Sequence, residues 1–266
     1  MQLHPVPASR GNAMSGAYYN EIDPYAAQWL RNLIAAGHIA PGDVDERSIE
    51  DVHPDDLKHY TQCHFFAGIG VWSLALRRAG WPDDRPVWTG SCPCQPYSKA
   101  GKRLGFADPR HLWPAWSHLI RERRPPELFG EQSPEALVHG WFDLVQGDLE
   151  EAGYAAGAIH FAAASCGEPI LRKRVYFAAK HLGEGAQGQQ SRRSPCQAGP
   201  RRWRGEEDLR AIADSPLQPG DRWPQPIVRS LDHGYSGRMG ALHAIGNALN
   251  AEAATQFIAA YLDATS

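Results

Sequence analysis

The sequence of 266 residues has no long hydrophobic run. No window approaches the roughly 20 continuous apolar residues that a membrane-spanning helix needs. The first residues contain no apolar segment of the kind that marks a secretory signal, and we expect residues 1–16 to be flexible. These absences predict a cytoplasmic protein with no membrane partner.

Cysteine is scarce, and its spacing excludes the common zinc motifs. The chain has five cysteines, of which only Cys92 and Cys94 lie close together. Structural zinc sites usually combine two close pairs of ligands, so we expect no metal. An odd number of cysteines without an export signal also favours reduced thiols in a reducing compartment. A zinc-binding regulatory module stays open as an alternative that a metal assay would test.

Net charge is also low, at -3, and provides no strong overall attraction to nucleic acid. The charge is unevenly distributed, however. Between Arg172 and Arg204 there are nine lysine or arginine residues and one acidic residue, Glu184. This run either follows a phosphate backbone or forms a solvated basic loop, and the sequence alone leaves both open.

Apolar periodicity indicates that strands alternate with helices. A first helix is predicted after Asp23, a typical N-cap, and Pro24, which suits the first helical turn. Apolar residues then recur at helical spacing until Gly37: Ala26, Trp29, Leu30, Leu33 and Ile34. Strand-like segments occupy residues 18–23, 42–52, 61–70, 85–94, 126–132 and 174–179. Further helices are predicted over residues 71–80, from residue 114, over 138–153 and over 254–262.

This alternation predicts an α/β fold, a mostly parallel sheet with helices on both faces. Such sheets bind ligands at the carboxyl ends of their strands. Four features follow predicted strands directly: Glu21, the Gly68–Gly70 turn, Cys94 and Glu131. Their common placement predicts a single active site.

Each feature has a functional and a plain structural interpretation. The glycines of "FFAGIG" let backbone amides approach a ligand, or they only form a tight turn. Glu21 can bind ribose hydroxyls or be a surface acid. A thiol in "GSCPCQPYS" is placed to act as a nucleophile, or both cysteines are inert and buried. Arg172 and Arg174 alternate at the start of a strand and therefore point to one face.

The segments "FAGIG", "GSCPCQPYS", "GEQ", "GEPILRKRVYFAA" and "IGNAL" follow one another in this order. They resemble the motif series of DNA (cytosine-5) methyltransferases, and the resemblance covers roughly residues 17–180 and 240–262. It implies a Rossmann-like sheet that uses S-adenosylmethionine. By this match Cys94, between Pro93 and Gln95, is the nucleophile, and Cys92 is not.

The resemblance assigns further residues to the site. Catalytic roles fall to Cys94, Glu131, Arg174 and Arg172. Substrate-binding roles fall to Pro93, Gln95, Ser98 and Lys102. Cofactor-binding roles fall to Phe66, Ala67, Gly68, Ile69, Gly70 and Asn247. The chain departs from the family at Gln132 and Ser133, at Ile170 and at Asn250, none of which changes the nucleophile or the acid.

One departure concerns the order of the motifs. Only 24 positions separate Gly70 from Cys94, where the family has two further strand–helix units. Segments that resemble those units lie before "FAGIG" instead. We therefore expect a circular permutation within the cofactor half, in which Glu21 takes the ribose role and Ile22 also binds the cofactor. The adenine-side acid is Asp45 or Asp43.

The resulting organisation is a catalytic domain over residues 17–180, with residues 240–266 packing back onto it, and a small irregular target-recognition segment over residues 181–239. The expected partner is duplex DNA, with a restriction endonuclease of the same target sequence as a second partner, and the expected state is a monomer. An RNA cytosine-5 methyltransferase and a catalytically silent DNA-binding relative are the alternatives.

Overall fold

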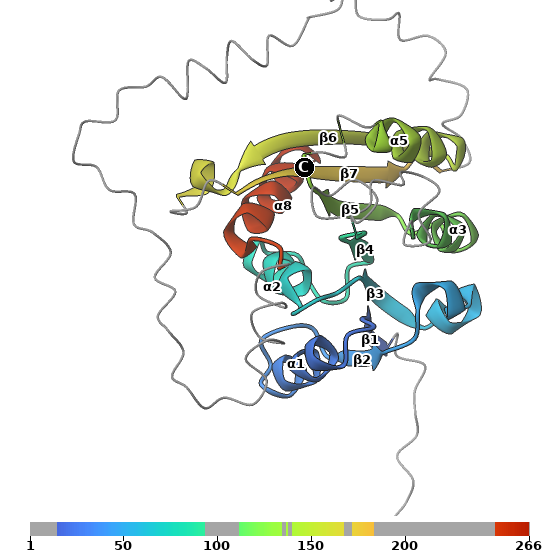
Figure 1. Cartoon of the computed structure of the whole chain (residues 1–266), viewed down its shortest axis with the longest axis vertical. Coiled ribbons are helices and arrows are strands. Elements are labelled where there is room, and N and C mark those ends of the chain that lie inside the picture. Colours follow the sequence, from blue (N-terminus) through green and yellow to red (C-terminus); the bar gives the residue numbers. More distant parts are fainter. Residues whose placement is uncertain are drawn as a thin grey trace, which may run out of the picture.

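The computed structural model describes residues 15–93, 112–134, 137, 140–167, 172–183 and 248–265. In these ranges the strands form one sheet in the order β2-β1-β3-β4-β5-β7-β6 (Figure 1). The strands β2, β1, β3, β4 and β5 are parallel, whereas β7 is antiparallel to both of its neighbours. Their bounds are β1 Ser15–Asn20, β2 Gly42–Asp45, β3 Tyr60–Phe65, β4 Val87–Gly90, β5 Glu127–Gln132, β6 Tyr154–Ala162 and β7 Lys173–His181.

Helices cover both faces of this sheet, so the predicted α/β architecture is confirmed (Figure 1). The α-helices are α1 Pro24–Ala35, α2 Val71–Arg78, α3 Trp113–Arg123, α5 Trp141–Glu151 and α8 Ala251–Thr265. The short 3₁₀ helices are η1 Ile49–Asp51, η2 Pro54–Leu57 and η4 Ala163–Cys166. Among the described helices, none combines the length and the apolar character needed to cross a membrane.

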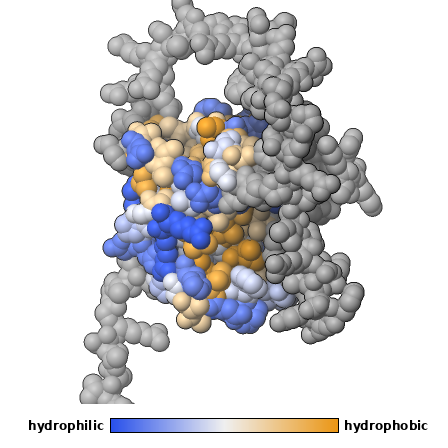
Figure 2. Space-filling model, turned by 90° about the vertical axis from the view of Figure 1, so that its left-hand side faces the viewer, coloured by the Kyte–Doolittle hydropathy of each residue, from blue (hydrophilic) through white to orange (hydrophobic). Residues whose placement is uncertain are grey.

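Two clusters of buried side chains, rich in aromatic residues, hold the helices against the two faces of the sheet. On one face, α2 and α8 pack on Phe129 and Tyr176. On the other face, α3 and α5 pack on Phe65 and Phe177. Neighbouring residues of a strand point to opposite faces, which is why Tyr176 and Phe177 belong to different cores. Figure 2 looks onto the side where α1, α2 and α8 lie and shows hydrophobic residues flanked by hydrophilic ones.

Helix α1 begins as the sequence predicts. The Asp23 carboxylate accepts a hydrogen bond from the backbone N–H of Ala26 at 2.9 Å, and Pro24 occupies the first turn. Gly37 follows the helix with φ +73°, a conformation that favours glycine. One expectation is wrong: Trp29, assigned to the apolar face, is 39% exposed, because the buried stripe is centred on neighbouring positions. The buried residues of α1 are Ala26, Ala27 and Leu30.

Strand β6 was not predicted. Its sequence, "YAAGAIHFA", is rich in alanine and glycine, which have low strand propensity. It nevertheless pairs with β7 along its whole length, from Tyr154 opposite His181 to Ala162 opposite Lys173. Pairing with a neighbouring strand therefore decides the structure of this segment, against its local preference.

The carboxyl ends of the parallel strands form one row. Register places Asn20 beside both Asp45 and Phe65, Phe65 beside Gly90, and Gly90 beside Gly130. The residues that follow each strand thus lie along one edge of the sheet, as the sequence predicts. In chain order, β1 and β2 come first and lie towards one side of the sheet, and β3 follows them and lies nearer the centre.

Candidate active site

At the carboxyl edge, Glu21 meets the glycine turn that follows β3. Its Oε2 accepts a hydrogen bond from the Gly68 N–H at 2.7 Å, and its Oε1 accepts one from the Asp23 N–H at 2.9 Å. Gly68 has φ +54°, and a Cβ added there would meet no atom within 4 Å. A Cβ at Gly70, with φ +78°, would press on Leu30 at 3.0 Å. The turn therefore leaves open space at Gly68, beside the Glu21 carboxylate, and packs tightly at Gly70.

Apolar side chains accompany this carboxylate. Phe66 adopts φ +51°, unusual for a residue other than glycine, and its ring meets Trp116 edge-on at 6.3 Å. Ile22, next to Glu21, is 64% exposed. Ala67 is buried, and its N–H donates to the Asn20 carbonyl at 3.0 Å. The turn "FAGIG" is thus tied to the end of β1, and Phe66 and Ile22 keep accessible apolar surface.

The structure distinguishes the two candidate adenine-side acids by position. Asp45 ends β2 level with Asn20, at the carboxyl edge, and its backbone carbonyl accepts from the Glu21 N–H at 3.0 Å. Asp43 lies two residues further from the edge and accepts a hydrogen bond from the Tyr60 hydroxyl at 2.8 Å. Of the two, Asp45 is nearer to Glu21.

The Asp45 carboxylate is held by its surroundings. Arg47 donates to it from its guanidinium, with the shortest distance 2.7 Å, and the Tyr18 hydroxyl donates at 2.7 Å. Burial opposes ionisation of Asp45, but these hydrogen bonds outweigh it and lower the pKa of the carboxyl. Asp45 is therefore a fixed anion at neutral pH.

The loop after β4 is anchored where β5 ends. The Gln132 amide donates to the Cys92 carbonyl at 3.1 Å, and the Trp72 indole donates to the Ser91 hydroxyl at 3.0 Å. Cys92 is 4% exposed, and Pro93 is half-buried. The remaining predicted residues of this loop and of the late motif lie outside the described residues: Cys94, Gln95, Ser98, Lys102 and Asn247.

An ion pair between a buried acid and a half-buried arginine lies one strand away from that loop. Glu131, near the end of β5, and Arg174, on β7, approach to 2.6 Å between Oε1 and Nε. Glu131 Oε1 nevertheless accepts no well-directed hydrogen bond within the described part of the chain. We therefore describe the contact as a close ion pair with poor hydrogen-bond direction.

The surroundings of Glu131 make it a weaker acid than an exposed carboxyl. Burial raises the pKa of its carboxyl, and the guanidinium groups of Arg174 and Arg172 only partly oppose this shift. Burial and the neighbouring Arg174 in turn lower the pKa of Arg172, which lies half-buried just before β7. The two arginines predicted to share a face are thus brought together with the predicted acid. A carboxyl with a raised pKa beside two cations can donate or accept a proton at a ring nitrogen.

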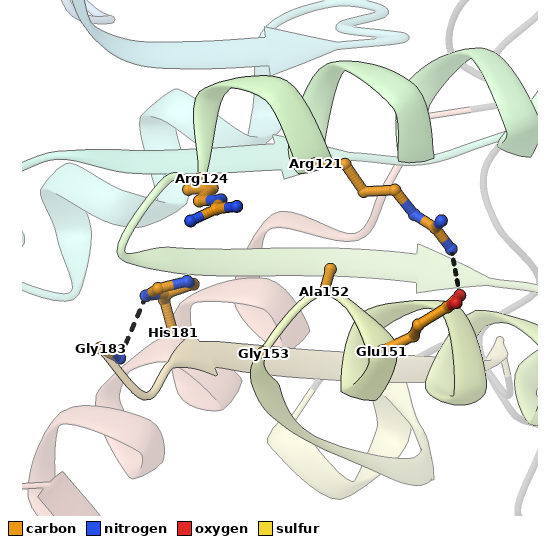
Figure 3. A pocket seen from close by; sticks show the side chains of 7 residues that line it. All are labelled: Arg121, Arg124, Glu151, Ala152, Gly153, His181 and Gly183. Carbon is orange, nitrogen blue, oxygen red and sulfur yellow. Dashed lines mark hydrogen bonds and ion pairs between the residues drawn. The ribbon is translucent and has the colours of Figure 1, made fainter. Parts of the chain in front are cut away.

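A cavity of about 290 Å³ lies elsewhere. Arg121, Arg124, Glu151 and His181 line it, with the turn at Gly153 (Figure 3). The backbone N–H of His181 donates to the carbonyl of residue 126, just before β5, so the cavity lies at the amino edge of the sheet. Arg121 is paired there with Glu151 at 2.9 Å. We do not assign it to the active site, because it is far along the strands from Glu131.

The described residues contain neither a second reactive thiol site nor a metal site. No cluster of three metal-ligating side chains occurs among the described residues. The described cysteines Cys63, Cys92 and Cys166 form no disulfide. Full burial raises the pKa of the Cys63 thiol, so this cysteine is unreactive.

The sequence interpretation missed three residues that shape the site: Trp72, Gln132 and Tyr176. Gln132 was noted only as a departure from the family, yet it holds the loop that carries the predicted nucleophile. Its place directly after Glu131 in "GEQ" was the available signal. No sequence signal marked Trp72 or Tyr176 as site residues, because apolar patterns in helices and strands predict that aromatic residues belong to the core.

The fold and this edge define a class: an α/β enzyme fold with an acid, two arginines and a cysteine-bearing loop at the carboxyl ends of its strands. The family model of the C-5 cytosine-specific DNA methylases matches residues 75–219, more than half of the chain. The chain belongs to this family.

Curated relatives match parts of the chain. Type II methyltransferase M1.ScrFI of Lactococcus lactis subsp. cremoris is 34% identical over 98 residues, which cover 35% of this chain and 25% of that protein. Type II methyltransferase M.NgoMIV of Neisseria gonorrhoeae is 35% identical over 161 residues, covering 45% and 51%. The chain thus matches about a quarter to a half of the length of these relatives.

Among solved structures, a mutant of DNMT2 from Spodoptera frugiperda aligns with a TM-score of 0.44 and 16% sequence identity. The alignment covers 63% of this chain and 43% of that one.

Proposed function

We propose that the protein transfers a methyl group from S-adenosylmethionine to carbon 5 of cytosine in duplex DNA. One observation supports this most strongly: Glu131, Arg174 and Arg172 come together beside the loop that leads to Cys94. An acid with a raised pKa and adjacent cations suit attack by a thiolate on an electron-poor, nitrogen-rich ring.

The proposed mechanism gives each residue a chemical task. The Cys94 thiolate adds to carbon 6 of the ring, which makes carbon 5 nucleophilic. Glu131 holds ring N3 and the exocyclic amine as negative charge develops, and Arg174, with Arg172, neutralises charge at O2. S-adenosylmethionine supplies an electrophilic methyl group. Loss of the proton from carbon 5 then expels Cys94. The cytosine must leave the duplex first, which costs a few kcal/mol.

Residues of the carboxyl edge would hold the cofactor. The Glu21 carboxylate suits the ribose hydroxyls, and the open space at Gly68 leaves room beside it. Phe66 and Ile22 offer apolar surface to the adenine. We favour Asp45 over Asp43 on the adenine side because only Asp45 reaches the edge.

The strand order supports the proposed permutation. The turn "FAGIG" follows the third strand of the chain, yet this strand lies inside the sheet, between β1 and β4. The strand β1, which Glu21 follows, and the strand β2, which ends at Asp45, precede it in the chain and lie outside it in the sheet. Packed layers tolerate such rewired connections, since each strand keeps its neighbours.

Substitutions at this edge test the cofactor assignment. We expect Glu21→Ala and Asp45→Ala each to weaken S-adenosylmethionine binding by about tenfold, a loss of roughly 1.4 kcal/mol. Calorimetric titration would measure the dissociation constants. Asp43→Ala is the positional control, and Arg47→Ala removes the ion pairs of Arg47 with Asp45 and Asp56 while the Asp45 carboxylate stays in place. Unchanged affinity in both acid variants would contradict the permuted cofactor site.

Methyl transfer from labelled S-adenosylmethionine to mixed-sequence duplex DNA tests the function. We expect label on DNA with the wild type and with Cys92→Ser, and none with Cys94→Ser, because only Cys94 follows the family pattern. Bisulfite sequencing of the product would identify the target. Label on competing RNA instead of DNA would replace the proposed substrate, and cofactor binding without any transfer would indicate a silent relative.

The domain assignment and the remaining partners are also proposals. We propose that residues 17–180 with 240–266 form the catalytic domain and that residues 181–239, most of which lie outside the described residues, read the target. The relatives are named type II methyltransferases, which supports a restriction endonuclease of the same target as a partner. Sedimentation would test the proposed monomer.

A further inference from the structure

Tyr176 lies directly opposite Glu131 in the pairing of β7 with β5. Side chains of paired residues in antiparallel strands point to the same face, with Cβ atoms about 4.5–5.5 Å apart. Tyr176 is 1% exposed, and its ring stacks on Phe161 at 4.8 Å and packs on Phe257 at 5.4 Å. The ring is therefore fixed beside the acid.

The hydroxyl of Tyr176 is buried without a hydrogen-bond partner in the part of the chain that the structure describes. Buried hydroxyl groups are nearly always paired, because an unmade hydrogen bond costs free energy. The other buried tyrosines of the described part follow this rule: Tyr18 bonds Asp45, Tyr19 bonds Ala40 and Tyr154 bonds Pro125. The partly buried Tyr60 and Tyr261 also have partners, Asp43 and Glu127. Tyr176 differs from all five, and it is the one beside Glu131.

This hydroxyl is suited to donate a hydrogen bond. Burial raises the pKa of Tyr176, and the nearby Glu131 carboxylate raises it further, while Arg174 and Arg172 act in the opposite direction. The hydroxyl therefore stays protonated. The acceptor that shares its face is Glu131, which also interacts with Ser91 and Arg172 and whose Oε1 has a poorly directed contact with Arg174.

In the proposed reaction Glu131 contacts ring N3 and the exocyclic amine, whereas Arg174 contacts the neighbouring O2. A movement of Arg174 towards O2 lengthens its 2.6 Å contact with Glu131 Oε1, and the charge of this buried oxygen is then less well compensated. We propose that Tyr176 is a positioning residue that replaces Arg174 as the hydrogen-bond donor to Glu131. When Arg174 turns to the base, the Tyr176 hydroxyl donates to Glu131 and keeps the carboxyl directed at the ring. This inference rests on the proposed function for the roles of Glu131 and Arg174.

A double-mutant cycle tests the contact without any ligand. Arg174→Met imitates the departure of the guanidinium. We expect Tyr176→Phe to leave the Tm of the wild type unchanged or raised, but to lower the Tm of Arg174→Met by about 2–4 °C. In an Arg174→Met and Glu131→Ala background this effect should vanish. The same effect of Tyr176→Phe in all three backgrounds would overturn the proposal.

Kinetics test the consequence, with Tyr154→Phe as the matched control. Tyr154 donates to the Pro125 carbonyl at 2.7 Å, at the other end of the sheet. We expect Tyr176→Phe to lower kcat about tenfold with little change in KM for the cofactor. Tyr154→Phe should lower the Tm and leave kcat unchanged.

An active wild type with an unchanged kcat in Tyr176→Phe would refute the positioning role. A wild type that transfers no methyl group would instead refute the proposed function, and the ligand-free cycle would still decide whether Tyr176 can replace Arg174 at Glu131.

Discussion

Replacement of Glu131 by glutamine is expected to lower the rate of methyl transfer by about two to four orders of magnitude, the usual range for a lost general acid or base. Glutamine keeps the shape of the side chain but cannot exchange a proton with ring N3. Single-turnover transfer from labelled S-adenosylmethionine would measure the rate. Because the residues assigned to the cofactor and to target reading are untouched, binding of cofactor and DNA should remain.

The same substitution should change how stability depends on pH. The pKa of Glu131 is raised in the folded protein, so the folded state binds the proton more tightly than the unfolded chain does. The stability of the wild type therefore declines as pH rises above the ordinary carboxyl pKa of about 4.3, until it passes the raised value. Glu131→Gln lacks this decline, so its stability relative to the wild type should improve between pH 5 and pH 8. Urea unfolding of both proteins at pH 5 and at pH 8 would measure this difference in stability.

Glu127→Gln is the matched control, because Glu127 lies on the same strand and face but at the amino end. Its carboxylate accepts hydrogen bonds from Arg85 at 2.9 Å and from Tyr261 at 3.2 Å. We expect this variant to lose stability and to retain the wild-type rate within about twofold. If Glu131→Gln also kept its rate within this range, the acid role would be contradicted.

Gly130→Ala is expected to destabilise the protein by about 3 kcal/mol, the upper part of the range for overpacking a core. A Cβ at Gly130 would lie 2.0 Å from the Phe177 ring. That ring is 1% exposed and packed against Trp116, Trp141 and Phe142, so it cannot move aside cheaply. Urea unfolding with an unchanged m-value would report the loss as a lower midpoint.

Gly157→Ala provides the control for this prediction. Gly157 lies in the neighbouring part of the same sheet, in β6, and an added Cβ there would meet no atom within 4 Å. We expect this variant to be as stable as the wild type or slightly more stable, because alanine restricts the unfolded chain. Equal losses in the two variants would show that strand glycine as such, and not the Phe177 contact, sets the cost.

Local chemistry made several elements predictable. Asp23 and Pro24 start α1 through contacts within one turn, and Gly37 ends it through its own backbone freedom. The alternation of strands and helices was sufficient to predict that Glu21 and Glu131 lie at one edge, because parallel strands share the direction of their carboxyl ends. The sequence by itself thus determined the fold class and the edge that carries the candidate site.

Contacts between distant segments decided the rest. The ion pair of Glu131 with Arg174 depends on the antiparallel register of β5 and β7, which no local pattern encodes. Register also pairs Tyr176 with Glu131 and places Gly130 under Phe177. Residues Tyr154–Ala162 form strand β6 despite their low strand propensity, because they pair with β7 along their whole length. Sequence spacing specifies which way a side chain points along its own element, whereas only tertiary packing specifies which charge, ring or hydroxyl it meets there.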